Sequence, residues 1–310
     1  MSLGIASFQV MLDKGQEEDW FASHLITTLA VVALVTLTIF VVRQIRAREP
    51  LVDFRLFGYA TYTAGVVVAT VLGFVLYGSL VLPLFMQNLL GFSAVVAGLW
   101  SSPRGVATAF IMPLTGYMLG KHWDARVMLT IGLVIASFAF FGYSHLNGDA
   151  GPHDFLVPQV IQGIGMALVF VPLTTITMDP IPLQSIGYAT SIYSLMRNIG
   201  SSVGISYVTT MLARRAQFHQ DRLVEAVNAY NTQATGTIGQ LGSALQAGGV
   251  AAPAAPVASL GVVYREVLQQ ASLMAFVDLF YVLGILFLAA VPVVWFMQRP
   301  QGKKPAVEVH

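Results

Sequence analysis

The chain has 310 residues, of which 56% are hydrophobic and only 10% are charged, and its mean hydropathy is +0.72. A water-soluble domain carries roughly a quarter of its residues as charged side chains, so this composition excludes an ordinary soluble enzyme. The net charge of +1 includes 16 Lys and Arg residues that are dispersed at segment ends, which argues against a nucleic-acid-binding patch. We therefore expect an all-α integral membrane protein.

Seven stretches are long and apolar enough to cross a bilayer. A spanning helix needs about 20 mainly apolar residues, because each residue adds about 1.5 Å toward a hydrocarbon core of about 30 Å. Residues 1–23 precede the first stretch and resemble the end of an earlier helix with an extracytoplasmic loop. The expected spanners are His24 to Val42, Tyr59 to Met86, Ala94 to Met118, Val127 to Leu146, Phe155 to Met178, Gly187 to Leu212 and Met274 to Met297.

The charges of the short loops predict the orientation, because positive residues are retained on the cytoplasmic side. Basic residues follow the first, third and seventh spanners, whereas the opposite short loops are acidic or uncharged. We therefore expect the carboxyl terminus in the cytoplasm. The basic residues are Arg43, Arg46, Arg48, Arg55, Lys121, Arg126, Arg299, Lys303 and Lys304. The acidic residues are Glu17, Glu18, Asp19, Asp149 and Asp154.

The longest connection, residues 213–270, joins the last two expected spanners. It combines charged residues, the tract AGGVAAPAAP and one expected amphipathic helix near AQFHQDRLVEAVNAY. We expect a water-exposed extracytoplasmic hairpin or loop. Its arginines do not overturn the orientation, because long loops are translocated largely regardless of charge.

Four pieces of sequence, in a fixed order, resemble one transporter family. They are FQVMLDKGQEEDWFAS from Phe8, SSPRGVATAFIMPLTG from Ser101, QGIGMALVFVPLTTITM from Gln162 and SLMRNIGSSVGISYVTTMLARR from Ser194. The pieces resemble the EmrB/QacA-type drug:proton antiporters of the major facilitator superfamily, which have fourteen spanners. The resemblance covers essentially the whole chain, but only the carboxyl half of such a transporter.

This resemblance implies a domain organisation. Residues 24–45 would be an inserted central spanner, residues 46–58 a cytoplasmic loop, residues 59–297 the carboxyl-terminal six-helix bundle and residues 298–310 a cytoplasmic tail. The amino-terminal six-helix bundle of the family, with its antiporter motif, has no counterpart in these residues.

The segment GYMLGKHWDARVML is similar to the family's cytoplasmic loop motif. In that motif, glycine permits close helix approach and basic residues lock helix ends. The resemblance assigns Gly116, Lys121, Asp124 and Arg126 to the motif, with Gly120 at a position where the family often has an acid.

Ionisable side chains are costly inside a bilayer, so each one marks either a function or a buried partner. Arg104 lies about ten residues into the third spanner, where it either lines a transport cavity or is a structural arginine. A structural Arg104 would bind carbonyls freed at Pro103 or extend to an interface. Arg197 and Asn198 lie in the middle of the sixth spanner, so we expect them to face a cavity or another helix.

Three further positions are candidates for the transport cavity or for proton coupling. Asp278 is the only carboxylate well inside an expected spanner, where it either carries a proton or lies wet near the helix N-terminus. Gln159 and Gln162 either bind a ligand or join helices by hydrogen bonds. Tyr193 is one of several aromatic and Met residues that either contact varied ligands or simply pack in the core or against lipid.

The sequence predicts no metal and no cofactor. It has no cysteine, and its six histidines lie at loops or helix ends without an HExxH pair. It lacks the GxxxxGK[ST] phosphate-binding loop that ATP-driven transport would need and the GxSxG motif of serine hydrolases.

The resemblance implies one half of a proton-coupled exporter of hydrophobic drugs in a bacterial inner membrane, which works by the rocking of two bundles. Its partners would be the bilayer, the drug, protons and an amino-terminal half on a missing segment or a separate chain. This half is not expected to transport alone. The alternatives are a membrane partner or scaffold, a non-functional truncated fragment and a polytopic membrane enzyme, for which no His, Asp or Glu cluster is evident.

Overall fold

The computed structural model describes residues 2–16, 18, 20–46, 53–78, 81–148, 150–228 and 230–298, and these residues form helices and turns without a strand. Seven of the charged residues used above to predict the orientation lie outside these ranges: Arg48, Arg299, Lys303, Lys304, Glu17, Asp19 and Asp149. The helices are α1 (Ser2–Lys14), α2 (His24–Arg46), α3 (Ala60–Gly78), α4 (Val81–Asn88), α5 (Ala94–Gly120), α6 (Ala125–Tyr143), α7 (Pro152–Met178), α8 (Ile186–Ala226), α9 (Thr232–Ala247) and α10 (Ala255–Val294).

Each of the seven expected spanners lies in helical structure, the second of them in α3 and α4. Five helices in the described residues are long and apolar enough to cross a membrane. The other two expected spanners lie in α5 and α8, which have 27 and 41 residues and pack in the same bundle. The five candidate spans are His24–Arg46, Ala60–Asn88, Ala125–Tyr143, His153–Met178 and Ala255–Val294.

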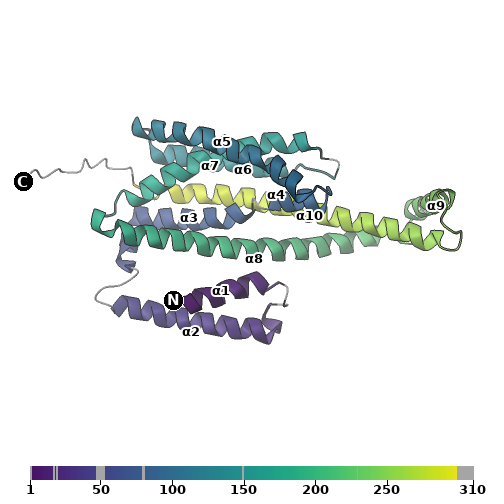
Figure 1. Cartoon of the computed structure of the whole chain (residues 1–310), viewed down its shortest axis with the longest axis horizontal. Coiled ribbons are helices and arrows are strands. Elements are labelled where there is room, and N and C mark those ends of the chain that lie inside the picture. Colours follow the sequence, from purple (N-terminus) through teal and green to yellow (C-terminus); the bar gives the residue numbers. More distant parts are fainter. Residues whose placement is uncertain are drawn as a thin grey trace, which may run out of the picture.

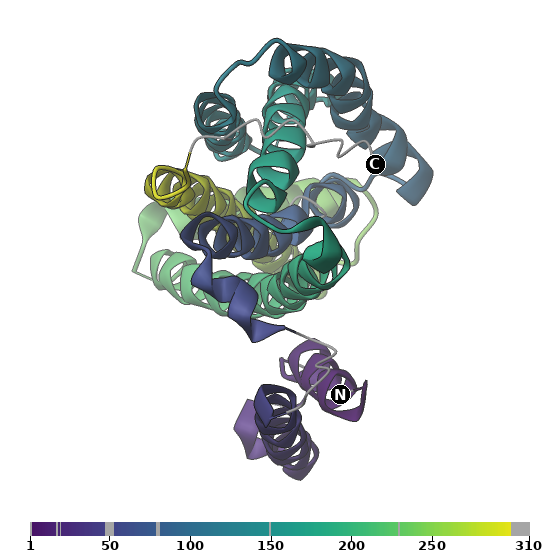
Figure 2. The same ribbon diagram turned by 90° about the vertical axis from the view of Figure 1, so that its left-hand side faces the viewer.

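Six of the long helices form a bundle of two layers. One layer follows the order α5, α7, α3 and α8, because each of these helices packs against the next. In the second layer, α6 packs on α7, and α10 packs on α6, α3 and α8. Figure 2 shows α6 and α10 on the same side of the first layer, whose other side has no covering layer in the described part of the chain. We call this the uncovered face.

Small residues let the backbones of the bundle approach closely. Gly73 of α3 lies against the backbone oxygen of Arg197, and Gly200 of α8 lies against that of Thr70. At a third crossing, a Cβ added to Gly132 of α6 would come within 2.8 Å of the backbone oxygen of Gly165 on α7. Such contacts are how membrane helices associate, because lipid offers no hydrophobic driving force between them.

α8 and α10 extend well beyond the rest of the bundle (Figure 1). They contain 41 and 40 residues, so each is about 60 Å long, about twice the hydrocarbon thickness. With α9 they form the helical projection, residues 213–272. The expected hairpin or loop at 213–270 is therefore mostly helix, since α8 continues to Ala226 and α10 already begins at Ala255. The hydropathy of a sequence falls where a helix leaves the lipid, but the backbone hydrogen bonds of the helix can continue beyond that point.

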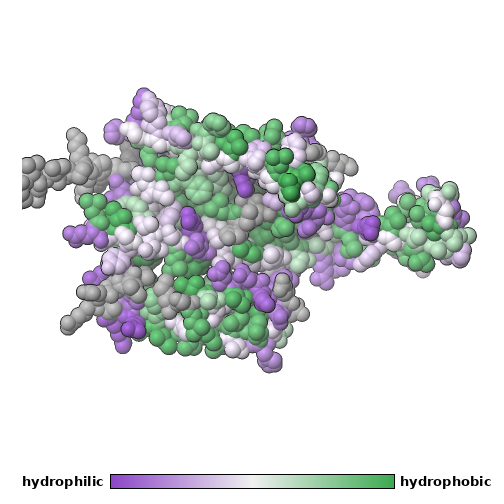
Figure 3. Space-filling view, viewed as in Figure 1, coloured by the Kyte–Doolittle hydropathy of each residue, from purple (hydrophilic) through white to green (hydrophobic). Residues whose placement is uncertain are grey.

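α1 and α2 pack on each other outside the two-layer bundle, and α1 contacts α8 at its edge (Figures 1 and 2). The space-filling view shows hydrophobic residues over much of the flank of the molecule and hydrophilic residues where the projection leaves the bundle (Figure 3). On α5 the exposed apolar residues include Leu99 and Phe110, which are 68% and 78% exposed. This distribution fits a helical bundle surrounded by lipid.

Candidate functional site

The polar residues expected in α5 and α7 lie together, along the seam between these two helices. Gln159 is buried on α7, and its amide nitrogen donates a hydrogen bond of 2.5 Å to the backbone oxygen of Trp100 on α5. One turn further along, Gly163 packs directly against the backbone of Arg104. Thr108 closes the seam, because its hydroxyl donates to the backbone oxygen of Gly163 at 3.0 Å.

Gln162 points to a different neighbour, the last residue of α6. The hydroxyl of Tyr143 donates a hydrogen bond of 3.0 Å to the amide oxygen of Gln162, and both side chains are buried. The amide nitrogen of Gln162 is buried as well and has no hydrogen-bond partner in the described structure. Tyr143 also interacts electrostatically with Arg104, so α5, α6 and α7 each contribute one polar side chain to this junction. We call these three residues the Arg104 cluster.

Arg197, Asn198 and Tyr193 lie together on α8, on the side of the bundle opposite α5. The backbone of Arg197 contacts Gly73 of α3, and its side chain is partly exposed and interacts electrostatically with Tyr193 one turn away. Tyr193 is buried, whereas Asn198 is exposed. Tyr193 of the same helix is the electrostatic neighbour of Arg197, and no carboxylate in the described residues forms an ion pair with Arg197.

Asp278 of α10 binds two residues of the helical projection. Its carboxylate lies 2.8 Å from Nε2 of His219 and 3.5 Å from a guanidinium nitrogen of Arg215, both on α8. His219 is largely buried, and its ring also contacts Phe218. The alternative that Asp278 lies near a helix N-terminus is wrong, because α10 begins 23 residues earlier at Ala255.

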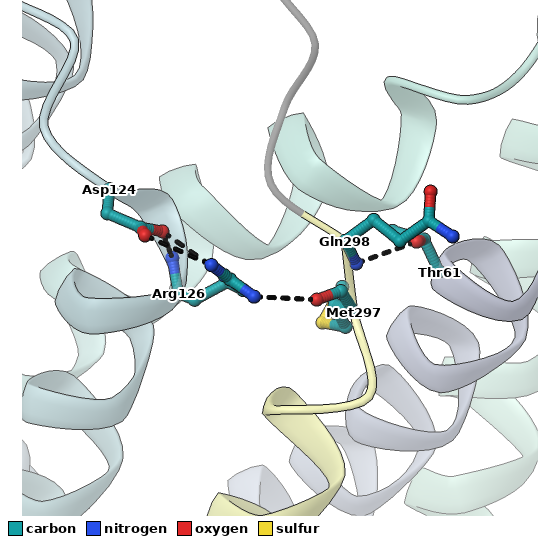
Figure 4. Close-up of polar contacts among 5 residues, drawn as sticks. All are labelled: Thr61, Asp124, Arg126, Met297 and Gln298. Carbon is teal, nitrogen blue, oxygen red and sulfur yellow. Dashed lines mark hydrogen bonds and ion pairs between the residues drawn. The ribbon is translucent and has the colours of Figure 1, made fainter.

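The residues of the expected loop motif join three helix ends at one end of the bundle (Figure 4). Asp124 caps α6, and its carboxylate accepts hydrogen bonds from the backbone and guanidinium of Arg126. Arg126 also donates to the backbone oxygen of Met297 at 3.2 Å, just after α10. The next residue, Gln298, donates its backbone N–H to the hydroxyl of Thr61 on α3 at 2.9 Å.

The other members of the motif do not take part in this junction. Lys121 is exposed and lies over the ring of Tyr117, 4.8 Å from its centre. A Cβ added to Gly116 or to Gly120 would meet no atom within 4 Å, so neither glycine lies at a close helix crossing in the described structure.

The structure therefore places the predicted residues in four separate places: Arg104 with Gln159 and Gln162, the α8 group around Arg197, Asp278 beside the helical projection, and the motif around Arg126. Tyr143 and His219 complete two of the polar groups but were not expected from the sequence. Nothing in the sequence marks Tyr143, a helix-terminal tyrosine, as different from other tyrosines. The described residues contain no group of three or more His, Asp or Glu side chains that could hold a metal ion.

Comparisons with known proteins identify the family of this bundle. The sequence profile described as the Major Facilitator Superfamily matches residues 13–205. A solved structure titled as a bacterial homolog to the human lysosomal transporter Spinster, in an inward-facing and occupied conformation, superposes with a TM-score of 0.51 and 20% sequence identity. That superposition covers 89% of this chain and 59% of the other and indicates a similar fold.

Curated relatives align over almost all of this chain. The fatty acid resistance protein FarB of Neisseria gonorrhoeae is 34% identical over 302 residues, which make up 97% of this chain and 58% of FarB. The multidrug export protein EmrB of Escherichia coli K12 is 32% identical over 304 residues, which make up 97% of this chain and 57% of EmrB. This chain thus spans little more than half the length of these relatives. With the family profile and the helical bundle, these matches show that the chain is a multi-pass membrane protein of the Major Facilitator Superfamily.

Proposed function

We propose that this chain is the carboxyl-terminal half of a proton-coupled exporter of hydrophobic and amphipathic compounds in a bacterial inner membrane. The relatives described above are named for multidrug export and for fatty acid resistance. Two six-helix bundles that rock about a site near the midplane would provide alternating access. This chain would supply one wall of that site.

The observation that carries the proposal is the polarity of the uncovered face. α7 is flanked by α5 and α3 and backed by α6, so its exposed residues Thr174 and Thr175 lie on this face. α8, at the edge of the same layer, exposes Ser191 and Asn198. Polar side chains within spanning helices usually face a bundle interior or a water-filled cavity, not lipid. The uncovered face is therefore where we place the second bundle and the transport cavity.

Proton coupling requires a group that gains and loses a proton as the transporter turns over. Asp278 and His219 are the candidates we favour in this chain, because a carboxylate and an imidazole share a contact of 2.8 Å beside the bundle. Histidine exchanges a proton near neutral pH more readily than any other side chain.

The proposal is tested by restoring a full-length transporter. This chain is fused to the part of FarB that it does not match, which under this proposal is the amino-terminal half, and the fusion is expressed in a strain that lacks its own exporters. We expect resistance to a long-chain fatty acid or to a lipophilic dye, and we expect none from this chain alone. Arg197→Gln should abolish the resistance, whereas Arg55→Gln, at an exposed arginine before α3, should not.

Two results would contradict the proposal. Resistance conferred by this chain without any partner would overturn its assignment as half of a transporter. A fusion that reaches the membrane in normal amounts and confers no resistance to either class of compound would overturn the export function and favour a scaffold or partner role.

A further inference from the structure

We propose that the groove between α1 and α2 binds an anionic phospholipid, with an acyl chain in the groove and the phosphate on Arg43 and Arg46. The inference goes beyond the proposed export function and does not depend on it. It starts from a hollow of about 570 Å³ between α1, α2 and the turn that joins them. This volume lies within the usual range of ligand pockets, about 300 to 1,000 Å³. We call this hollow the α1–α2 groove.

The lining of the α1–α2 groove is apolar. From α1 it includes Phe8 and Met11, and on α2 it runs from Ala30 to Val42. The one hydroxyl that the described lining carries belongs to Thr38, and this hydroxyl already donates to a backbone oxygen of its own helix at 2.7 Å. The described walls therefore offer hydrocarbon contacts to a ligand and no unpaired hydrogen-bonding side chain.

The shape of the groove suits a slender chain. Its floor contains small residues, of which Ala33 is only 3% exposed, whereas Leu34 and Phe21 stand at its rim and are 70% and 67% exposed. A helix with its side chains is about 10 Å across, so these rim side chains would hold it away from the floor. An alkyl chain is narrow enough to lie between them.

The length of the groove matches one leaflet of the bilayer. Ala30 and Val42 are 12 residues apart on α2, so this part of the groove is about 18 Å long. One leaflet supplies about half of a hydrocarbon core of about 30 Å. An acyl chain that enters at the Val42 end would therefore reach approximately to the middle of the membrane.

Two arginines lie where the groove reaches the end of α2. A second hollow, of about 530 Å³, shares Thr38 and Val42 with the groove and is also lined by Arg43 and Arg46. Thr38, Val42 and Arg46 follow one another at intervals of four residues, so they share a face of the helix. Both arginines are exposed, and neither forms an ion pair with a carboxylate of the described residues.

A phospholipid phosphate satisfies both parts of this site. Guanidinium groups bind phosphate oxygens through paired hydrogen bonds, and basic residues at the cytoplasmic end of a spanning helix attract the anionic lipids of that leaflet. The basic residues of the short loops predict that this end of α2 faces the cytoplasm. A free phosphate would use the arginines but not the groove, and an uncharged lipid would use the groove but not the arginines.

The test is native mass spectrometry of the purified chain, released from detergent micelles that contain one added phospholipid. The probes are dioleoyl phosphatidylglycerol, which is anionic, and dioleoyl phosphatidylcholine, which has the same acyl chains and no net charge. We expect the anionic lipid to bind about tenfold more tightly or better, because two arginines face its phosphate. An excess of inorganic phosphate should not displace it, and displacement would assign the site to a free anion and overturn the proposal.

The double substitution Arg43→Gln with Arg46→Gln tests the head-group end of the site. It should weaken the binding of phosphatidylglycerol by about tenfold or more and leave that of phosphatidylcholine unchanged. The matched control is Arg55→Gln with Lys121→Gln. It removes two positive charges from exposed positions at the same end of the molecule (Figure 1), neither of which lines the groove.

The substitution Thr38→Trp tests the groove itself, because Thr38 lines both hollows. The indole should fill the groove and weaken the binding of phosphatidylglycerol by about tenfold, since the displaced acyl chain loses its apolar contacts. Val35→Trp is the control, because Val35 is half-exposed on α2 and lines neither hollow. Each variant must elute as a monodisperse species with unchanged helical circular dichroism, so that loss of binding is not loss of fold.

Three results with the chain alone would overturn the inference. They are equal binding of the two lipids to wild type, an unchanged lipid preference in the Arg43 and Arg46 variant, and an equal loss of that preference in the control pair. The last result would show a general attraction of anionic lipid to a positive surface.

The same measurement on the fusion with FarB tests a competing occupant, a helix of the amino-terminal half. If a monodisperse fusion no longer binds phosphatidylglycerol, that half covers the groove and the lipid assignment is overturned. Retained binding that still depends on Arg43 and Arg46 supports it. Lipid binding and resistance are separate readouts, so failure of the export function and failure of this site can be distinguished.

Discussion

At the scale of single residues, the contacts of Asp278 show what could be predicted from the sequence and what could not. The sequence marks Asp278 as the one carboxylate well inside an expected spanner. Its partners Arg215 and His219 belong to the long connection at 213–270, where an amphipathic helix that includes His219 is expected. The sequence does not indicate that this helix packs against the last spanner, so no pairing could be predicted. They reach Asp278 only because α8 continues past the end of the expected spanner. The hydrogen bond between Tyr143 and Gln162 could not be predicted either, because neither the residue types nor their spacing in the sequence indicates it.

Loss of the Asp278 contacts should lower stability. In Asp278→Asn the ion pair with Arg215 disappears and the contact with His219 loses its charge. Because Arg215 and Asp278 are partly exposed, we expect the free energy of unfolding to fall by only about 1 kcal/mol, with a lower unfolding temperature. Tryptophan fluorescence during heating in detergent measures this. Glu225→Gln is the control, because Glu225 and its partner Arg222 are both strongly exposed, and an equal effect of the two substitutions would contradict the prediction.

The glycine at the crossing of α3 and α8 is sensitive to a single added carbon atom. A Cβ at Gly73 would overlap the backbone oxygen of Arg197, and a backbone atom cannot turn aside as a side chain can. We expect Gly73→Ala to destabilise the protein by about 1 to 3 kcal/mol, as overpacking of a core does. Gly98→Ala, at a helical position with no atom within 4 Å of the added Cβ, should be neutral or slightly stabilising. Thermal unfolding of both variants under the same conditions decides the comparison.

At the scale of whole elements, hydropathy predicts where the chain is apolar, and helices can be longer than their apolar stretch. This explains why α2 and α6 begin close to the expected positions, whereas α10 begins at Ala255 and not at Met274. The Ala, Gly and Pro residues before α10 suggested irregular structure. Pro256 is tolerated because the first turn of a helix has no need of its N–H.

The junction of Asp124, Arg126 and Met297 should control the fraying of two helix ends. Arg126→Gln removes the hydrogen bond to the backbone after α10 and the ion pair at the start of α6. If the free energy of local opening falls by about 1 kcal/mol, amide hydrogen exchange in residues 291–297 should be roughly fivefold faster. Lys121→Gln, which changes a neighbouring exposed residue outside the junction, should leave the exchange rate unchanged. Equal exchange in both variants would show that the junction does not hold α10.

At the scale of the whole molecule, the two-layer bundle could be predicted only as a class. The order of helices within the layers depends on close crossings such as Gly132 with Gly165, and a single sequence does not reveal which glycines meet. The packing places the turn between α5 and α6 and the end of α10 at one end of the bundle, and the helical projection at the other (Figure 1). Which end faces the cytoplasm stays a prediction from the basic residues.

The absence of native cysteine makes this orientation directly testable. Gly236→Cys introduces a thiol on exposed α9 in the projection, and Lys121→Cys introduces one in the turn between α5 and α6. In intact cells, a membrane-impermeant maleimide should label position 236, and it should label position 121 only after permeabilisation. The parent chain should not be labelled at all, and the reverse pattern would overturn the predicted orientation.

The continuity of α8 and α10 also has a mechanical consequence. Each helix is an unbroken rod of about 60 Å, and the two rods are joined by a contact between Asp278, near the middle of α10, and His219, near the C-terminal end of α8. A tilt of about 10° at one end of such a rod displaces its far end by about 10 Å, a distance comparable to the width of a helix. The two helices therefore move together as a lever. A small change in tilt at the buried helix crossings would produce a larger displacement at the end of the projection that carries α9.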